Sequence, residues 1–111
     1  MNNLPLKQIY EESEFKLILE KESAFLLFKH SLTCPISRGA FDQFTAYLEE
    51  HNEINGYYLT VQDSRPLSNF IANHFAIKHE SPQIFYIKSG EVKWHTSHGE
   101  ITKETIEKVT L

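Results

Sequence analysis

The run AFLLFK at residues 24–29 is the sequence feature that most constrains the fold. It is short and continuously apolar, which is typical of a strand buried on both faces, as in a parallel sheet. Parallel strands cannot be joined by a tight turn and need a long crossover between them, usually a helix. The run therefore favours an α/β chain in which strands alternate with helices.

Helical spacing of apolar residues occurs on both sides of this run. Residues 13–21 carry apolar side chains on one face, with Ser13 as a possible N-cap. Residues 35–50 return to the same period after Pro35, which suits the first turn of a helix. Gly39 weakens this second helix by roughly 1 kcal/mol relative to alanine. The apolar positions that define the two helices are Phe15, Ile18, Leu19, Ala40, Phe41, Phe44, Tyr47 and Leu48.

The rest of the chain continues the alternation and ends with two strands joined by a Ser-Gly turn signal, followed by a helix. Strands separated by helices imply right-handed crossovers and parallel pairing, and the hairpin adds an antiparallel edge. We therefore predict one thioredoxin-like α/β domain over residues 1–111, with a four-stranded mixed sheet and helices on both faces. The remaining predicted elements are a turn at 52–56, strands at 57–61, 83–88 and 91–95, a helix at 65–75 that begins near Pro66, and a last helix that opens at Thr102 with Ile106 and Val109 inward.

Composition excludes several classes of protein. The chain has 111 residues, 41% of them hydrophobic and 23% charged, and a net charge of −4, which is ordinary for a soluble globular protein. No basic block predicts nucleic-acid binding, and no apolar run is long enough to span a bilayer. The N-terminal residues lack a hydrophobic signal region, so we expect a cytoplasmic protein without membrane or nucleic-acid partners.

The stretch HSLTCPISRGA at 30–40 contains the only cysteine, Cys34, at the predicted junction between strand and helix. Unpaired backbone N–H groups and the helix dipole at such a junction favour the thiolate, which is the nucleophile in thiol–disulfide exchange. Pro35 has no N–H to donate, so we expect the amides of Ile36 and Ser37 to stabilise the thiolate, with the Ser37 hydroxyl as a further donor. The alternative is a buried, inert cysteine that packs as a small apolar residue.

Ser81-Pro82 directly precedes the predicted strand at 83–88. In a thioredoxin-like sheet this point lies beside the start of the helix that carries Cys34. We predict a cis bond there, which leaves backbone groups free to pair with an extended substrate. The alternative is a trans proline that only begins an edge strand.

The motif TCPIS at 33–37, together with SPQIFYIKSGEVKWHTSHGEIT at 81–102, resembles the monothiol bacilliredoxins. The resemblance extends from the first predicted helix to the last. It implies that Cys34 is the attacking thiol and that Pro82 is the cis-proline beside it. It also implies a substrate class, protein cysteines capped by the small thiol bacillithiol, which is then a co-substrate.

The expected function is removal of bacillithiol from such proteins through a mixed disulfide with Cys34. A hydroxyl at Ser37 cannot displace the bound thiol, so free bacillithiol or a partner oxidoreductase has to reset the enzyme. The substrate groove is expected to be framed by Thr33, Pro35, Ile36, Ser81 and Pro82.

Two other functions stay open on the sequence. The chain could be a redox-sensing or adaptor module that holds a partner, or a carrier that binds an iron–sulfur cluster through Cys34 and a small thiol. The six histidines show no metal-ligand spacing with the cysteine, so we expect no metal site. His30 is either a residue that tunes the thiolate or a partly buried histidine at the end of its strand.

Overall fold

The computed structural model describes residues 4–110, so residues 1–3 and 111 of the predicted domain lie outside it. It contains a five-stranded mixed sheet in the order β1-β3-β2-β4-β5. The strands are β1 (Leu6–Gln8), β2 (Ala24–His30), β3 (Asn55–Thr60), β4 (Gln83–Lys88) and β5 (Glu91–Ser97); the helices are α1 (Glu12–Lys21), α2 (Pro35–Glu50), α3 (Arg65–Phe75) and α4 (Lys103–Thr110), with a 3-10 turn at His98–Glu100.

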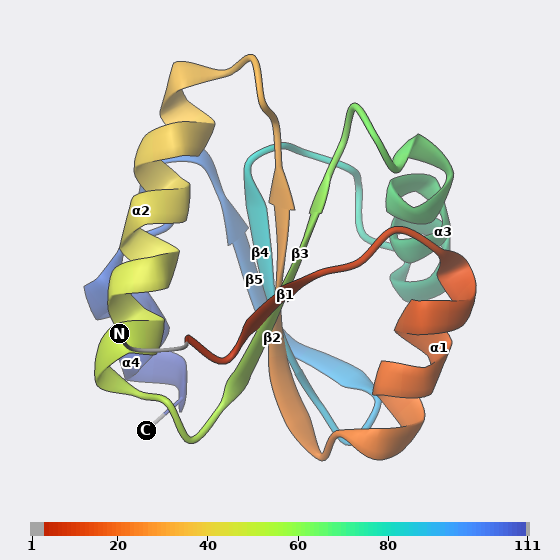
Figure 1. Cartoon of the computed structure of the whole chain (residues 1–111), viewed down its shortest axis with the longest axis horizontal. Coiled ribbons are helices and arrows are strands. Elements are labelled where there is room, and N and C mark those ends of the chain that lie inside the picture. Colours follow the sequence, from red (N-terminus) through yellow and green to blue (C-terminus); the bar gives the residue numbers. More distant parts are fainter. Residues whose placement is uncertain (1–3, 111) are drawn as a thin grey trace.

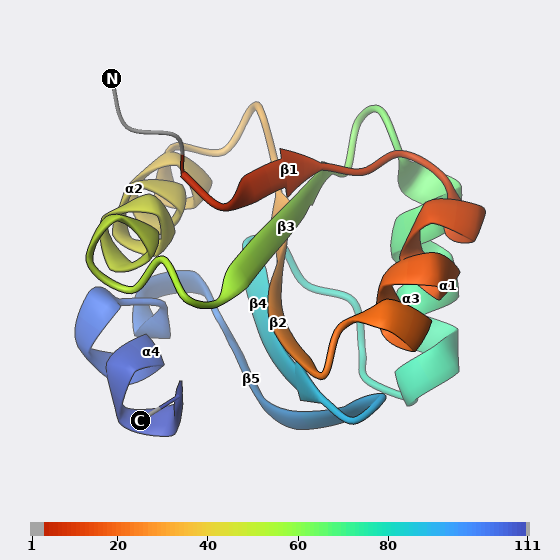
Figure 2. The ribbon, with the colours of Figure 1, turned by 60° about the horizontal axis from the view of Figure 1, so that its bottom comes forward.

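Helices cover both faces of the sheet, as the sequence predicted. Helices α1 and α3 pack on one face, and α2 and α4 pack on the other (Figure 1). A view from another direction shows the same three layers, with the sheet between the two helix pairs (Figure 2). Because successive residues of β2 point to opposite faces, Phe25 and Leu27 enter the α1/α3 core, whereas Leu26 and Phe28 enter the α2/α4 core.

The register of the sheet brings three loops to one edge. Strand β2 runs parallel to β3, with His30 opposite Thr60, so the segments that follow both strands leave from the same end. Strand β4 runs antiparallel to β2, with Lys29 opposite Gln83, so the segment that precedes β4 arrives at that end as well. These segments, 31–34, 61–64 and 76–82, lie along the upper edge of the sheet in Figure 1.

The prediction of four strands was wrong by one strand. The extra strand β1 has three residues and pairs only with β3, from Leu6 opposite Gly56 to Gln8 opposite Tyr58. A segment this short has too few residues to show an alternating pattern, so its strand state depends on the neighbour that offers it hydrogen bonds.

The predicted N-cap of the first helix was also wrong. The cap is Glu11 rather than Ser13, and Glu11 and Glu14 form a reciprocal capping box. Carboxylates near the start of a helix also interact favourably with its dipole. Within residues 4–110, no helix has both the length and the apolar character that crossing a membrane requires.

Candidate active site

Cys34 is the N-cap residue of α2, and Pro35 is the first residue of the helix. Its backbone is extended, with φ −106° and ψ 116°, and its side chain is partly exposed. Cys34 N–H donates to the Ser31 carbonyl oxygen at 3.4 Å, which closes a turn between the end of β2 and the helix. The thiol is therefore not sealed in the core, and it stands at a helix start as the sequence indicated.

The first turn of α2 leaves one backbone donor near the cysteine. Ser37 N–H donates to the Cys34 carbonyl oxygen at 3.0 Å, and Arg38 N–H approaches the same oxygen at 3.3 Å. Ile36 N–H has no backbone acceptor among residues 4–110. Of the two amides expected to face the sulfur, only that of Ile36 is thus uncommitted, while the amide of Ser37 is used inside the turn.

The Ser37 hydroxyl does not lie where the sequence suggested. Ser37 is fully buried, and its Oγ accepts a hydrogen bond from Ser31 N–H at 2.9 Å and lies 2.7 Å from His30 Nδ1. No hydrogen bond between this hydroxyl and the Cys34 sulfur occurs within residues 4–110. The reason is the phase of the helix, because the third residue of α2 faces the sheet rather than the solvent.

His30 is the partly buried histidine at the end of β2. Its ring stacks on Phe41 with a centroid separation of 4.6 Å. Burial lowers the pKa of His30 below its ordinary value, and repulsion from Arg38 lowers it further, against a smaller opposing effect of Asp42. A neutral imidazole follows, and it anchors the start of α2 to the sheet through Ser37.

Gln62 is a site residue that the sequence reasoning missed. Its Oε1 accepts from Leu32 N–H at 3.1 Å, and its Nε2 donates to Ser31 Oγ at 3.1 Å and to Thr33 Oγ1 at 3.4 Å. One amide side chain thus holds three consecutive residues of the segment that leads to Cys34. The available signal was its place just beyond a predicted strand, because the carboxyl ends of parallel strands share one edge of a sheet.

Ser81 and Pro82 belong to segment 76–82, which reaches the same edge of the sheet as the segment before Cys34. The peptide bond between them is cis. Pro82 is buried and directly precedes Gln83, the partner of Lys29 in the sheet. The Pro82 carbonyl oxygen accepts from His98 N–H at 3.1 Å. The backbone groups of Ser81 have no backbone partner within residues 4–110, so they can pair with an extended chain.

Apolar surface surrounds the cysteine. Leu32 and Ile36 are 59% and 56% exposed, although large aliphatic side chains are mostly buried in folded proteins. Both lie within two residues of Cys34, and Thr33 and Pro35 between them are exposed as well. The thiol therefore stands in a surface that favours contact with another apolar surface.

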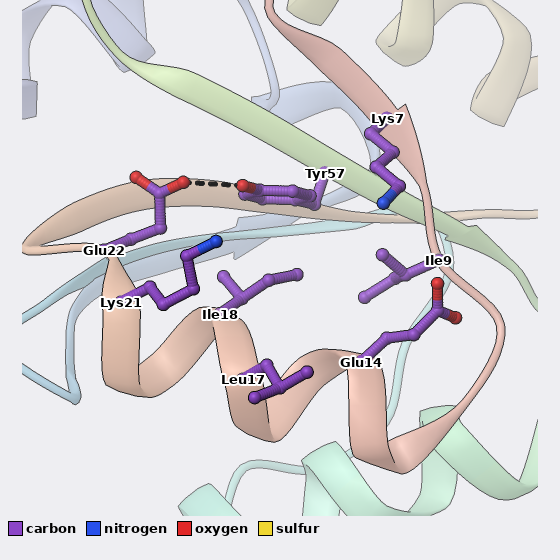
Figure 3. Close-up of a pocket in the computed structure, with 8 residues that line it drawn as sticks. All are labelled: Lys7, Ile9, Glu14, Leu17, Ile18, Lys21, Glu22 and Tyr57. Atoms are coloured by element: carbon purple, nitrogen blue, oxygen red, sulfur yellow. Dashed lines mark hydrogen bonds between the residues drawn. The ribbon is translucent and has the colours of Figure 1, made fainter.

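A separate hollow between α1, β1 and β3 offers no comparable chemistry (Figure 3). Its Glu22 carboxylate accepts from Tyr57 Oη at 2.6 Å, and its Glu14 carboxylate accepts from two backbone amides at the start of α1. Burial raises the pKa of Tyr57 well above its usual range, which keeps the phenol protonated. The hollow contains no cysteine, serine, threonine or histidine among its lining residues, which are Lys7, Ile9, Glu14, Leu17, Ile18, Lys21, Glu22 and Tyr57.

Comparison with known proteins bears directly on this arrangement. Residues 7–106 match the model of the family described as monothiol bacilliredoxin BrxC. The chain belongs to the monothiol bacilliredoxin family. Membership gives it a thiol–disulfide redox function, and Cys34 is the only cysteine in the sequence.

Solved structures agree with the fold. A protein with a thioredoxin fold, described as a candidate oxidoreductase, superposes with a TM-score of 0.91 at 39% identity, over 96% of this chain and 94% of that one. The thioredoxin NaTrxh from Nicotiana alata gives a TM-score of 0.76 at 11% identity, over 98% of this chain and 92% of that one. Mitochondrial thioredoxin 3 from Saccharomyces cerevisiae gives 0.75 at 12% identity, over 94% and 92%. The thioredoxin-like prediction is confirmed.

Proposed function

We propose that this bacilliredoxin removes bacillithiol from S-bacillithiolated protein cysteines through a mixed disulfide on Cys34. The observation that carries the proposal is the partly exposed thiol at the start of α2, flanked by exposed Leu32 and Ile36. Such a thiol can reach a disulfide on the surface of another protein, which an interior cysteine cannot do. Membership of a bacilliredoxin family supports bacillithiol as the capping thiol.

The first step is one thiol–disulfide exchange. The Cys34 thiolate attacks the bacillithiol sulfur, the bond from that sulfur to the client cysteine breaks, and the client leaves as a thiolate that takes a proton from water. Ile36 N–H has no backbone acceptor among residues 4–110 and donates to the attacking sulfur in this proposal. The backbone of Ser81 pairs with the client chain, and Thr33, Pro35 and Pro82 frame the groove. The number of disulfides stays constant, so no external oxidant or reductant enters this step.

The second step needs another thiol. The sequence contains no second cysteine, and the Ser37 hydroxyl is buried against His30. A bacillithiol thiolate, or a thiolate of a partner oxidoreductase, attacks the bacillithiol sulfur on Cys34 and forms a new disulfide. Cys34 leaves as a thiolate and is ready for the next client.

The test uses reduced full-length protein and a peptide whose single cysteine carries bacillithiol. We expect release of free peptide together with a gain of one bacillithiol mass on Cys34, both followed by intact mass spectrometry. The Cys34→Ala variant should do neither. Equal release by that variant, or no release by the wild type, contradicts the proposal.

The same preparation separates the two alternative functions. Visible absorbance of anaerobically purified protein that disappears in Cys34→Ala favours a cluster carrier. Partner binding that survives the substitution, without peptide release by the wild type, favours an adaptor.

A further inference from the structure

Lys29 is the most anomalous side chain near the active site. It is fully buried in the middle layer of the protein, although lysine is almost never buried without a counter-charge. Its Nζ donates to the Ser68 carbonyl oxygen of α3 at 3.0 Å and lies 3.2 Å from His79 Nδ1. The same Nζ lies 5.7 Å from the centre of the Phe85 ring. None of these partners is a carboxylate, so the ammonium is held in the core by neutral acceptors and an aromatic face.

His79 receives two donors at one atom. Its Nδ1 lies 3.2 Å from the Lys29 ammonium and 3.1 Å from Ser68 Oγ. An ammonium can only donate, so this nitrogen has to be unprotonated for the contact to form. The geometry therefore fixes His79 as the neutral tautomer that carries its proton on Nε2.

The segment that contains His79 leads directly to the substrate groove. Gln83 lies opposite Lys29 in the sheet and grips the same segment, with its Nε2 donating to the Lys78 carbonyl oxygen at 3.0 Å and its Oε1 accepting from Glu80 N–H at 3.3 Å. Lys29 and Gln83 thus tie residues 78–80 to the sheet, and Ser81–Pro82 follow at once.

We propose that the buried Lys29 and the half-buried His79 form a clamp that positions the Ser81–Pro82 segment beside Cys34. The proposal rests on the proposed function, because its consequence for activity is the alignment of a client chain along Ser81. Lys29 and His79 are positioning residues and touch no reacting atom. In this proposal, the free energy lost by burying the Lys29 ammonium without a carboxylate is accepted because the ammonium fixes the Ser81–Pro82 side of the groove.

The charges around the clamp make it sensitive to acid. The charged groups that face His79 are Lys29, Arg65 at the start of α3 and Glu80 in the same segment. Burial first, then Lys29 and Arg65, lower the pKa of His79 against a smaller opposing effect of Glu80. Glu80 is itself engaged by Ser97 Oγ at 2.9 Å and by His98 Nδ1 at 3.2 Å. Protonation of His79 at Nδ1 would leave this atom unable to accept from the Lys29 ammonium, so it should release the segment.

The test compares Lys29→Met, His79→Ala and His79→Asn with the wild type. Methionine fills the space without a charge, and the asparagine side-chain oxygen can accept where Nδ1 accepts but does not titrate. Two rates are measured for each protein: exchange with a bacillithiolated peptide, which uses the groove, and alkylation of Cys34 by iodoacetamide, which does not.

We expect Lys29→Met and His79→Ala to slow peptide exchange about tenfold, and to change alkylation less than twofold. His79→Asn should stay within about threefold of the wild type at neutral pH, and its rate relative to the wild type should rise as the pH falls below 6. Thermal unfolding of Lys29→Met should occur at or above the wild-type temperature, so its slower exchange cannot be attributed to a weakened fold. A folded Lys29→Met that exchanges at the wild-type rate overturns the proposal, as does an equal loss in both rates.

A measurement without any substrate separates this proposal from the proposed function. The Glu80 amide is held by Gln83 inside the clamped segment. Hydrogen exchange at this amide should be at least tenfold faster in Lys29→Met than in the wild type. Unchanged Glu80 protection in Lys29→Met overturns the clamp whatever the enzyme does to bacillithiol. If the wild type releases no peptide but Glu80 exchanges faster in Lys29→Met than in the wild type, the proposed function is overturned and the clamp is retained.

Discussion

Lys29 and His30 are adjacent in β2, yet they hold the two sides of the active-site edge in different ways. Lys29 points to the α1/α3 face as a fully buried cation, bound to Ser68 and His79. His30 points to the α2/α4 face as a neutral ring, stacked on Phe41 and bound to Ser37. The side of the edge that carries Ser81–Pro82, the proline side, thus depends on a desolvated charge. The side that carries Cys34, the cysteine side, depends on a packed aromatic ring. We therefore expect the two sides to respond differently to substitution and to pH.

The largest expected effect is a change in the free energy of unfolding on the proline side, which Lys29 holds. Lys29→Met should raise the free energy of unfolding at pH 7 by up to about 3 kcal/mol, because burial, with Arg65 as a smaller cause, lowers the pKa of Lys29 from 10.5 to about 8. A lowered pKa means that the folded state binds the proton more weakly than the unfolded state between pH 8 and 10.5. The wild type therefore gains stability as the pH rises through this window, and the gap to Lys29→Met should narrow.

Urea titrations at pH 7 and pH 10 measure this gap. Lys88→Met is the matched control, because Lys88 is exposed at the far end of β4 and should show almost no gap at either pH. A Lys29→Met protein less stable than the wild type at pH 7 would mean that the neutral acceptors around the ammonium more than offset its desolvation.

On the cysteine side, which His30 holds, the expected change in the free energy of unfolding is smaller and is a loss. His30→Phe keeps an aromatic ring against Phe41 but removes one of the two hydrogen-bond partners of the buried Ser37 hydroxyl, at a cost of about 1 to 2 kcal/mol. The folded-state pKa of His30 is lowered, so its contribution is complete above the unfolded value near 6.5 and is lost as the pH falls through the folded value. His30→Phe should therefore lose less stability than the wild type between pH 7 and pH 5, as measured by thermal unfolding. An equal loss in both proteins contradicts this reading.

The third expected effect concerns the segment before Cys34, which neither β2 residue holds. Gln62→Glu keeps the acceptor for Leu32 N–H but loses both donors, to Ser31 and Thr33, and adds a negative charge close to the sulfur. We expect peptide exchange to slow about tenfold, because the added charge opposes a thiolate. Gln43→Glu is the control, since it makes the same change of charge on α2 and keeps the acceptor for Lys103 N–H. Equal rates in the two variants would remove Gln62 from the site.

The smallest expected effect tests whether the sequence of α2, on the cysteine side, is already optimal for stability. Gly39 lies inside α2, and apart from the adjoining helix backbone a Cβ there would have no heavy atom within 4 Å. Gly39→Ala should therefore raise the free energy of unfolding by up to about 1 kcal/mol in urea titrations. Gly56→Ala is the opposite case, because its Cβ would come within 2.7 Å of Leu48 and 2.8 Å of Phe44, and it should destabilise the fold. Stabilisation by both substitutions, or by neither, would contradict the packing described for α2.

Local pattern was enough to predict the helix pairs, the central strands and the place of Cys34. The junction of β2 and α2 is marked by an apolar run that ends and by Pro35 at the next helix start, both of which can be read within a dozen residues. The cis bond before Pro82 needed more than local pattern, because a Ser-Pro pair before a strand is also compatible with a trans bond, and the prediction depended on the place of this pair beside Cys34 in a thioredoxin-like sheet.

The contacts that hold this junction could not be predicted in the same way. Gln62 and Leu32 are 30 residues apart, and Lys29 and His79 are 50 apart, so their pairing depends on the order of strands in the sheet. In the sequence, Lys29 looks like the polar end of an apolar run, and only its full burial in the structure shows that it points into the core. The direction of the Ser37 hydroxyl depends on helix phase, which a CxxS spacing does not determine.

The two outer strands bear on how the protein behaves at high concentration. One border, β1, is only three residues long, and the other, β5, alternates the exposed side chains of Glu91, Lys93 and His95 along its length. Short or charged borders discourage the edge-to-edge stacking that leads to aggregation. Removal of the residues up to Gln8 would take away β1 and uncover the edge of β3, which carries Tyr57 and Tyr58. The truncated protein should therefore precipitate at concentrations at which the full chain stays in solution.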